Sequence, residues 1–291
     1  MHISEINIYP IKSLKGIAVE SALVEQRGLQ YDRRWMLTTE RGMFFTQREF
    51  PSMATITTEV RSGGLRVSAD GFGGVSIPFE PDRGEHMRVT VWQSICDAHV
   101  YLGAVSEWFS DVLKTKCQLV LMPDSSKRHI NPLFDHGDDI VSFADGYPLM
   151  VLSEASLEDL NGRLAISAEK AEIPFQPLPM NRFRPNLVVS GSDAFAEDDW
   201  RTIRIGEAMF RSTKPCARCV ITTVDQAKGE FNGKEPLKTL STYRLAKQVM
   251  PDRIVRLGLT DTSVLFGQNL VAENPGAMIR IADMVEVVER F

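Results

Sequence analysis

Short runs of apolar and β-branched residues, separated by polar turns, dominate the chain. Ile6 and Ile8 alternate with polar neighbours before Pro10, and alternation with period two is typical of a half-buried strand. Further strand-like runs cover residues 35–39, 54–60, 65–67, 87–92, 118–122, 186–189, 202–205, 220–224, 278–281 and 284–288. Glycine-rich segments at 62–64 and 71–74 separate some of these runs. The pattern predicts antiparallel sheets or small barrels.

Three segments have the spacing of helices instead. In residues 105–113 the apolar side chains recur at i, i+3, i+4, i+7 and i+8, which places them on one helical face. Residues 156–164 carry leucines on one face, and Ser156 with Asp159 forms a variant of the capping box. Residues 239–249 predict a further helix. Because these helices are few and do not alternate regularly with strands, we expect a mostly β protein with a few helices (α+β) and no doubly wound sheet.

The length of the chain, 291 residues, corresponds to about two domains. A polar, loop-like region that includes residues 124–127 and 136–139 follows the first group of predicted strands. We therefore expect the boundary near residues 115–130 and divide the chain into a first domain of residues 1–120 and a second domain of residues 121–291.

Composition and charge narrow the class of protein. Hydrophobic residues make up 43% of the chain, and 33 basic against 38 acidic residues give a net charge of -5, which provides no overall field for binding nucleic acid. The N-terminus lacks the apolar run of a signal peptide, and no stretch approaches the roughly 18 apolar residues of a membrane span. The four cysteines suit a reducing compartment. We therefore predict a cytoplasmic protein with neither nucleic acid nor a membrane as its partner.

Two of the cysteines, Cys216 and Cys219, stand in one short motif. A nearby positive charge favours the thiolate, which attacks electrophiles and binds metals, and Arg218 is expected to supply that charge beside Cys219. A structural zinc site would need further paired ligands, and the chain offers none at the usual spacing. A thioredoxin-like pair normally opens a helix, whereas the β-branched run 220–224 predicts a strand after Cys219. The plainest alternative is that Cys216 and Cys219 are two small hydrophobic residues that are buried in the protein and have no chemical role.

A set of short motifs in one order extends over nearly the whole chain. They are residues 9–13, 32–35, 152–157, 184–186, 216–225, 234–237, 241–244, 265–269 and 273–276. Together they resemble the MOSC proteins, named for the molybdenum cofactor sulfurase C-terminal domain. More closely, the chain resembles the branch that includes the mitochondrial amidoxime-reducing component and its bacterial relatives. Several motifs in one order are far more specific than any single one.

The resemblance implies two β-barrel-like domains, a MOSC N-terminal barrel and a MOSC barrel, with a molybdenum cofactor (molybdopterin) held between them. It makes Cys219 the protein ligand of molybdenum and the catalytic residue. It places Cys216 near the metal but not among its direct ligands. The cofactor-binding residues that it implies are Lys12, Ser13, Arg33, Asp145, Gly146, Arg184, Asn186, Ala217, Arg218 and Asn269.

The residue chemistry agrees with these assignments. Lys12, Ser13 and Arg33 can bind a phosphate without making the whole protein basic. Asn186 and Asn269 offer the donors and acceptors that a polar pterin edge needs. Taken alone, each of these residues would indicate only a solvated turn or a surface ion pair.

The resemblance further implies an oxidoreductase that reduces N-hydroxylated compounds, such as hydroxylamino bases or amidoximes. The sequence shows no ferredoxin-type cysteine spacing, no membrane anchor and no desulfurase domain. We therefore expect a separate electron-transfer protein, a ferredoxin- or flavin-type reductase, to supply the electrons. The alternative is a sulfur or molybdenum-cofactor carrier in which Cys219 transiently bears a persulfide. A third hypothesis is a binding module that has kept the fold and lost the cofactor.

Overall fold

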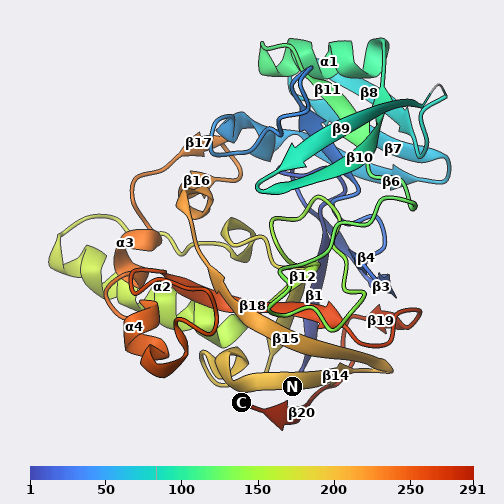
Figure 1. The fold of residues 1–291 in the computed structure, drawn as a ribbon. Coiled ribbons are helices and arrows are strands. Elements are labelled where there is room, and N and C mark those ends of the chain that lie inside the picture. Colours follow the sequence, from blue (N-terminus) through green and yellow to red (C-terminus); the bar gives the residue numbers. More distant parts are fainter. Residues whose placement is uncertain (83) are drawn as a thin grey trace.

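Two halves built mainly of strands lie one above the other in the computed structural model, which describes residues 1–82 and 84–291 (Figure 1). The lower half contains an eight-stranded sheet in the order β2-β1-β13-β12-β18-β15-β14-β20. In that order the strands are β2 (Ile17–Val19), β1 (His2–Ile8), β13 (Leu187–Ser190), β12 (Leu149–Ser153), β18 (Leu265–Ala272), β15 (Ala208–Ala217), β14 (Trp200–Ile205) and β20 (Val285–Arg290). Both chain termini lie at the bottom of this sheet (Figure 1).

The upper half contains two smaller antiparallel sheets. One has four strands, β5 (Trp35–Thr38), β11 (Gln118–Leu121), β10 (Ser94–Tyr101) and β9 (Glu85–Val91), and the other has β6 (Thr57–Arg61), β7 (Gly64–Ala69) and β8 (Gly73–Pro78). Short strands complete the fold: β3 (Ser21–Glu25), β4 (Gly28–Leu29), β16 (Val224–Asp225), β17 (Glu230–Phe231) and β19 (Met278–Arg280). The expectation of a mostly β protein with barrel-like halves is confirmed.

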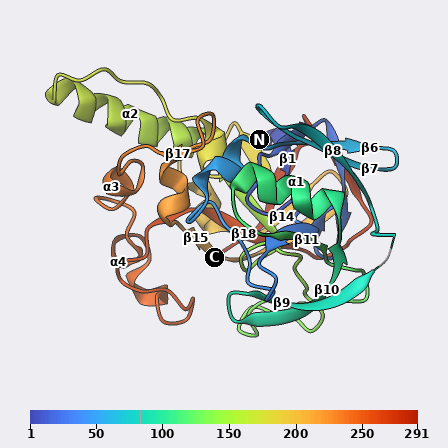
Figure 2. The same ribbon diagram turned by 90° about the horizontal axis from the view of Figure 1, so that it is seen from above.

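In the part of the chain that the structure describes, four α-helices lie outside the sheets. They are α1 (Ala104–Leu113), α2 (Glu154–Lys170), α3 (Leu237–Leu240) and α4 (Ala246–Val249). The same residues form five 3-10 turns, η1 (Pro51–Thr55), η2 (Met180–Arg182), η3 (Ala196–Asp199), η4 (Val220–Thr223) and η5 (Pro251–Arg253). Seen from above, α2, α3 and α4 lie on one side of the molecule, away from β6 and β7 (Figure 2).

The helix over residues 105–113 is confirmed as α1, and two other helices differ from their prediction. Helix α2 begins before Ser156, because Ser153 is its cap and accepts the backbone N–H of Ser156 at 3.1 Å. The predicted helix 239–249 is divided into the end of α3, a turn and α4. Hydroxyl groups of Ser241 and Thr242 bond to the preceding turn, which lets side chains compete with the continuing helix. The run 54–60 starts as η1 and becomes a strand only at Thr57.

Strand β1 crosses from the first part of the sequence into the lower sheet. It pairs antiparallel with β13, and Ile6 faces Leu187 across the two strands. The backbone N–H of Asn7 donates to the carbonyl of Asn186 at 2.8 Å. Because β1 ends beside the start of β13, the residues that follow Ile8 lie next to those that precede Leu187. The division of the chain at residue 120, just before the end of β11, stays a prediction.

Each half has its own hydrophobic core. Ile3, Trp200 and Phe210 are fully buried in the lower cluster, whereas Leu37 and Phe109 are fully buried in the upper one. Strands β1 and β14 each turn their apolar side chains to the core, with a register shift that interrupts the alternation near the start of each strand. The two cores hold the loops between the halves in fixed positions.

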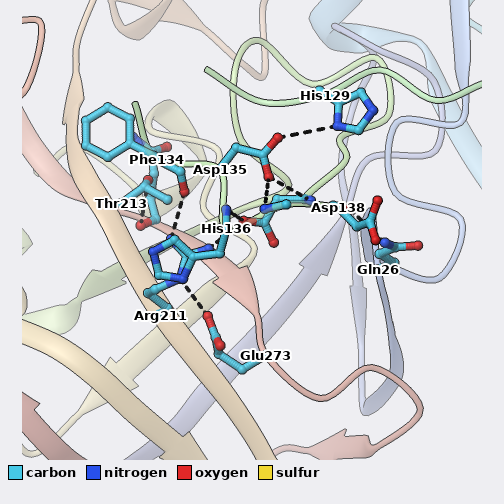
Figure 3. Close-up of polar contacts among 12 residues, drawn as sticks. Gln26, His129, Phe134, Asp135, His136, Asp138, Arg211, Thr213 and Glu273 are labelled. Atoms are coloured by element: carbon cyan, nitrogen blue, oxygen red, sulfur yellow. Dashed lines mark hydrogen bonds and ion pairs between the residues drawn. The ribbon is translucent and has the colours of Figure 1, made fainter. Parts of the chain in front are cut away.

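The long connection between β11 and β12, residues 122–148, is anchored by Arg211 of β15. Its guanidinium donates to the Asp139 carboxylate at 2.6 Å, to the Glu273 carboxylate at 2.6 Å and to the carbonyl of Phe134 at 3.0 Å (Figure 3). The Asp139 carboxylate also accepts the backbone N–H of His136 at 2.9 Å. Charge-assisted hydrogen bonds of this kind are roughly twice as strong as neutral ones, so the loop is held against the lower sheet.

A second arginine, Arg128, shapes the end of the same connection. It is buried, and it donates to the carbonyls of Ser142, Ala144 and Asp145 at 2.8, 2.6 and 2.7 Å. Three carbonyls that converge on one guanidinium fix the path of the backbone. The side chain of Asp145 is thereby placed between the two halves.

Candidate active site

A cleft opens where segments of both halves meet. It encloses about 830 Å³, its open mouth included. Its walls come from the segments that follow β1 and β11, the segments that precede β5 and β13, the end of β15 with the turn after it, and residues of β12 and β18. All of the site residues expected from the sequence line it: Lys12, Ser13, Arg33, Asp145, Gly146, Arg184, Asn186, Ala217, Arg218, Cys219 and Asn269. Cys216 lines it as well.

Lys12 lies almost fully buried in the wall of the cleft. Its ammonium donates to the carbonyl of Phe143 at 2.8 Å and to the carboxylate of Asp145. Burial lowers the pKa of Lys12 to about 8, although the charge of Asp145 opposes this change. Desolvation by the cleft walls would raise the pKa of Asp145, but the charges of Lys12 and Arg48 hold that pKa below its usual value. At neutral pH the cleft therefore contains both the ammonium and the carboxylate.

The lowered pKa of Lys12 predicts a dependence of stability on pH. Between pH 8 and 10.5 the unfolded chain keeps a proton on Lys12 that the native protein has lost, so stability rises with pH in this window. From pH 8 to 10 we expect the free energy of unfolding of the wild type to rise by about 2–3 kcal/mol relative to that of Lys12→Met. Denaturant unfolding across this range measures it. The exposed Lys116→Met is the control, and a flat difference for Lys12→Met would contradict the assignment.

The ring of Tyr9 lies against two guanidinium groups. The Cζ atoms of Arg33 and Arg184 are 4.4 and 4.3 Å from its centroid, which is cation–π distance. Arg33 also bonds to the buried carboxylate of Asp32 and to Oδ1 of Asn186 at 3.1 Å. Burial lowers the pKa of Arg184 to about 10, and its buried Nη2 has no hydrogen-bond partner among the described residues. The guanidinium groups of Arg33 and Arg184 are thus held side by side, and Nη2 of Arg184 is a donor without a partner among the described residues.

Three residues of this wall have backbone conformations that non-glycine residues rarely adopt. Ser13, Arg33 and Arg184 have φ angles of 69°, 50° and 55°. The left-handed region costs a non-glycine residue roughly 1–2 kcal/mol, and such outliers cluster at functional sites. These strained backbones therefore indicate that this wall is a functional site. The directions in which its side chains are held outweigh the cost in backbone energy.

The strand predicted over 220–224 is wrong for its first four residues, which form η4. Cys219 occupies the position that caps this turn. The hydroxyls of Thr222 and Thr223 donate to the carbonyls of Cys219 and Val220 at 3.0 and 2.8 Å, so side-chain hydrogen bonds favour the turn over the strand. The argument from a following strand against a thioredoxin-like pair therefore fails, although η4 is only a short turn.

Arg48, not Arg218, supplies the positive charge beside Cys219. Nη2 of Arg48 donates to Cys219 Sγ at 3.1 Å, while Nη1 is buried with no partner in the described part of the chain. The guanidinium of Arg218 donates to the carbonyls of Phe266 and Phe183 at 2.7 and 2.9 Å and so braces the wall. The expectation that Arg218 supplies the positive charge beside Cys219 is wrong. The guanidinium that contacts Cys219 belongs to Arg48, which lies 171 residues away in the sequence.

The two asparagines expected at a polar ligand edge differ in what they leave available. Asn186 is 1% exposed; its Oδ1 accepts from Arg33, and its Nδ2 donates to the carbonyl of Asn7 at 3.1 Å. Nδ2 of Asn269 donates to the carbonyl of Lys214 at 3.0 Å. Asn186 thus positions Arg33, whereas Asn269 is partly exposed and lines the cleft.

Comparison with known proteins assigns the family. The model of the MOSC N-terminal beta barrel domain matches residues 1–116, and that of the MOSC domain matches residues 138–286. The chain belongs to the MOSC family. Mitochondrial amidoxime-reducing component 1 of Mus musculus is 34% identical over 97% of this chain and 81% of its own length, and its Homo sapiens counterpart is 32% identical over 97% and 82%. This MOSC protein lies in the branch of those proteins, as predicted.

Another relative of this MOSC protein is much longer. Molybdenum cofactor sulfurase of Oryza sativa subsp. japonica is 33% identical over 85% of this chain, and the match spans 31% of that protein. In the part of the MOSC chain that the structure describes, no helix has the length and apolar character needed to cross a bilayer.

Residues that sequence reasoning missed contact the walls of the MOSC cleft. Nε2 of Gln47 donates to the carbonyl of Ser13 at 2.7 Å, and Nε2 of Gln226 donates to Oε1 of Gln47 at 2.9 Å. Oε1 of Gln226 in turn accepts from Arg184 at 3.4 Å. This amide pair joins segments 179 residues apart. No local spacing marks these glutamines or Arg48, since only the fold brings them next to the residues that line the cleft.

Proposed function

We propose that this chain binds a molybdopterin-type molybdenum cofactor in the cleft and reduces N-hydroxylated compounds. Cys219 is the proposed protein ligand of molybdenum and the catalytic residue. Electrons come from a separate electron-transfer protein, a ferredoxin- or flavin-type reductase. The observation that carries the proposal is that one cleft contains the Cys219 thiol together with three cations, Lys12 and Arg33 from the first half of the sequence and Arg184 from the second.

The donor set of the cleft fits a phosphorylated cofactor. Lys12, Arg33 and Arg184 line it as cations, and Nη2 of Arg184 is a buried donor without a partner among the described residues. A buried donor left without a partner costs about 1–3 kcal/mol, so an anion bound there stabilises the site. A phosphate group offers the oxygens that arginine forks bind best.

The thiol of Cys219 suits the metal end of the same cofactor. In the described residues, no group of three or more His, Cys, Asp or Glu side chains is placed to hold a metal ion. A metal that already has the sulfur ligands of its cofactor needs only one further protein ligand, and a thiolate is a soft ligand of this kind. Arg48 fixes the position of the sulfur, because its guanidinium donates to Sγ.

The bound cofactor would supply two-electron redox chemistry at the metal. The net reaction converts an N–OH group into N–H and water, with two electrons from the partner protein and two protons from solvent. The protein residues hold and orient the reactants: Lys12, Arg33 and Arg184 bind the anionic end, and Arg48 positions the sulfur of Cys219.

The match to the Oryza sulfurase keeps a second function in view, that of a sulfur or cofactor carrier with a persulfide on Cys219. Mass spectrometry distinguishes the two functions, since a labile extra sulfur without pterin favours the carrier. The cytoplasmic location stays a prediction from the sequence, as the two amidoxime-reducing components named above are described as mitochondrial.

Turnover with a chemical electron source tests the proposal. The protein is produced in cells that make the cofactor and is assayed with an amidoxime and reduced methyl viologen, which replaces the partner protein. We expect stoichiometric amidine and no turnover when the sample lacks pterin. A pterin-loaded sample that leaves several N-hydroxylated compounds unchanged would rule out the reductase and leave the carrier.

A further inference from the structure

A small hairpin brings one side chain from the second half of the sequence to a loop of the upper half of the fold. Strands β16 and β17 pair antiparallel, and the turn between them contains Gln226 and Gly229. Both strands contact η1 (Figure 1). A Cβ atom built on Gly229 would lie 2.9 Å from Cα of Ser52 and 2.9 Å from Cγ2 of Thr55. The turn therefore lies directly against η1, at a distance that only a glycine allows.

Gln226 and Gln47 form a reciprocal amide pair beside this hairpin. Nε2 of Gln226 donates to Oε1 of Gln47 at 2.9 Å, and Nε2 of Gln47 donates to Oε1 of Gln226 at 3.3 Å. The two residues are 7% and 0% exposed. A buried amide that loses its partner keeps the full cost of its removal from water. Each side chain therefore fixes the position of the other.

Each amide also holds one residue that lines the cleft, while the glutamines lie behind the wall. Nε2 of Gln47 donates to the carbonyl of Ser13 at 2.7 Å. Oε1 of Gln226 accepts from Nη1 of Arg184 at 3.4 Å. Because Ser13 and Arg184 have positive φ angles, backbone energy alone does not favour their conformations. The amide pair thus connects two strained wall residues that lie far apart in the sequence.

The contacts of Arg184 leave one of its nitrogens for a ligand. Nη1 is held by Gln226, and the guanidinium lies 4.3 Å from the centroid of the Tyr9 ring. Nη2 is buried and has no partner among the described residues. With one nitrogen held by an amide and the plane held by a ring, Nη2 is fixed in direction. A guanidinium held in this way loses little entropy when it binds a phosphate.

We propose that Gln47 and Gln226 are positioning residues of the anion-binding wall. Their amide pair holds the carbonyl of Ser13 and the guanidinium of Arg184 at the spacing that a bound phosphate group needs. The inference rests on the proposed function for the molecule that carries this phosphate. The positioning of the wall itself can be tested with inorganic phosphate.

Stabilisation by inorganic phosphate tests the proposal without molybdenum. The full chain is purified from cells that cannot make the cofactor, and its unfolding in phosphate is compared with its unfolding in chloride at the same ionic strength. We expect phosphate to stabilise the wild type. We expect the phosphate affinity obtained from this effect to fall about ten-fold in Gln226→Met and in Gln47→Met. An affinity equal to that of the wild type in both variants, or a wild type that phosphate does not stabilise, overturns the proposal.

Asn161→Met is the matched control for the loss of a buried or partly buried amide. Asn161 lies on α2, away from the cleft, and its side chain bonds to the carbonyl and the N–H of Leu178 at 3.0 and 2.8 Å. We expect this variant to melt at a lower temperature than the wild type and to keep the wild-type affinity for phosphate. A loss of phosphate affinity as large as that of the glutamine variants would mean that the affinity follows general stability, which overturns the positioning role.

The double variant shows whether the two glutamines act as one unit. Either single substitution already breaks the amide pair, so we expect Gln47→Met/Gln226→Met to bind phosphate about as tightly as the weaker of the two single variants. Losses of affinity that multiply in the double variant would contradict the paired role, because each glutamine would then act by itself.

Two glycine variants test the same amide pair from outside the cleft and leave both glutamines in place. Gly229 and Gly233 have φ angles of 68° and 69°, so alanine strains the backbone similarly at both positions. Only at Gly229 does the new Cβ meet η1, since no described atom lies within 4 Å at Gly233. We expect Gly229→Ala to weaken phosphate binding about three-fold relative to Gly233→Ala. Equal affinities would break the proposed link between the hairpin and the anion-binding wall.

Cofactor loading separates this inference from the proposed function. In loaded protein we expect pterin to dissociate about ten-fold faster from Gln226→Met than from Asn161→Met. Wild-type protein that acquires no pterin in cells that make it, but shows the expected order of phosphate affinities, would rule out the cofactor and keep the positioning role. Loaded wild-type protein together with equal phosphate affinities in all variants would overturn the positioning role alone.

Discussion

Replacement of Cys219 by alanine is expected to remove molybdenum from the protein and to lower turnover of N-hydroxylated compounds by more than about 100-fold. That factor is the upper end of the effect seen when only a supporting partner of a metal ligand is lost, and here the ligand itself disappears. The fold is expected to survive, because Cys219 lies at the cleft, half-buried and outside both cores. Metal analysis together with the chemical-reductant assay measures the effect.

Cys216→Ala is the matched control for this variant. Cys216 lies three positions earlier in the same cleft wall, and burial raises the pKa of its thiol, so it stays neutral and is a poor metal ligand. We expect this variant to retain most of its molybdenum. Full metal content in Cys219→Ala, or an equal loss in both variants, would contradict the assignment of the ligand.

Replacement of Asp32 by alanine is expected to lower the free energy of unfolding by about 3–5 kcal/mol, since it leaves a buried charge unpaired. The carboxylate of Asp32 is 1% exposed, accepts the backbone N–H of Tyr9 at 2.8 Å and is paired with Arg33. Its loss frees Arg33 from its fixed direction toward Asn186. Cofactor content is therefore expected to fall together with stability.

Asp124→Ala provides the comparison for this effect. Its carboxylate is also paired with an arginine, Arg34, but the side chain is 90% exposed, and exposed ion pairs contribute about 0–1 kcal/mol. Denaturant unfolding of both variants at neutral pH measures the difference. Similar losses of unfolding free energy in Asp32→Ala and Asp124→Ala would contradict the larger contribution that we expect from the buried ion pair beneath the cleft.

Local patterns predicted the elements whose stability is local. The apolar stripe over residues 105–113 gave α1, because helical spacing alone places those side chains on the upper core. The alternation around Ile6 and Ile8 gave β1 for the same kind of reason. Where side chains compete with the backbone, as Thr222 and Thr223 do in η4, the β-branched pattern misled.

The site residues divide in the same way, into those that a local motif marks and those that only the fold brings together. Motifs that resemble a known family brought Lys12, Arg184 and Cys219 to attention, and the fold places all three in one cleft. The pairing of β1 with β13 explains how the first two meet. Arg48 and Gln226 could not be found in this way, because their contacts with Cys219 and Gln47 span 171 and 179 residues and leave no local pattern.

The molybdenum and pterin content of the wild-type protein tests the central claim most directly. The protein is purified from cells in which another molybdenum enzyme is shown to be fully loaded, so that cofactor supply is assured. We predict that molybdenum and fluorescent oxidised pterin co-purify with the chain in equal amounts. Protein from the same cells that contains neither would contradict the account.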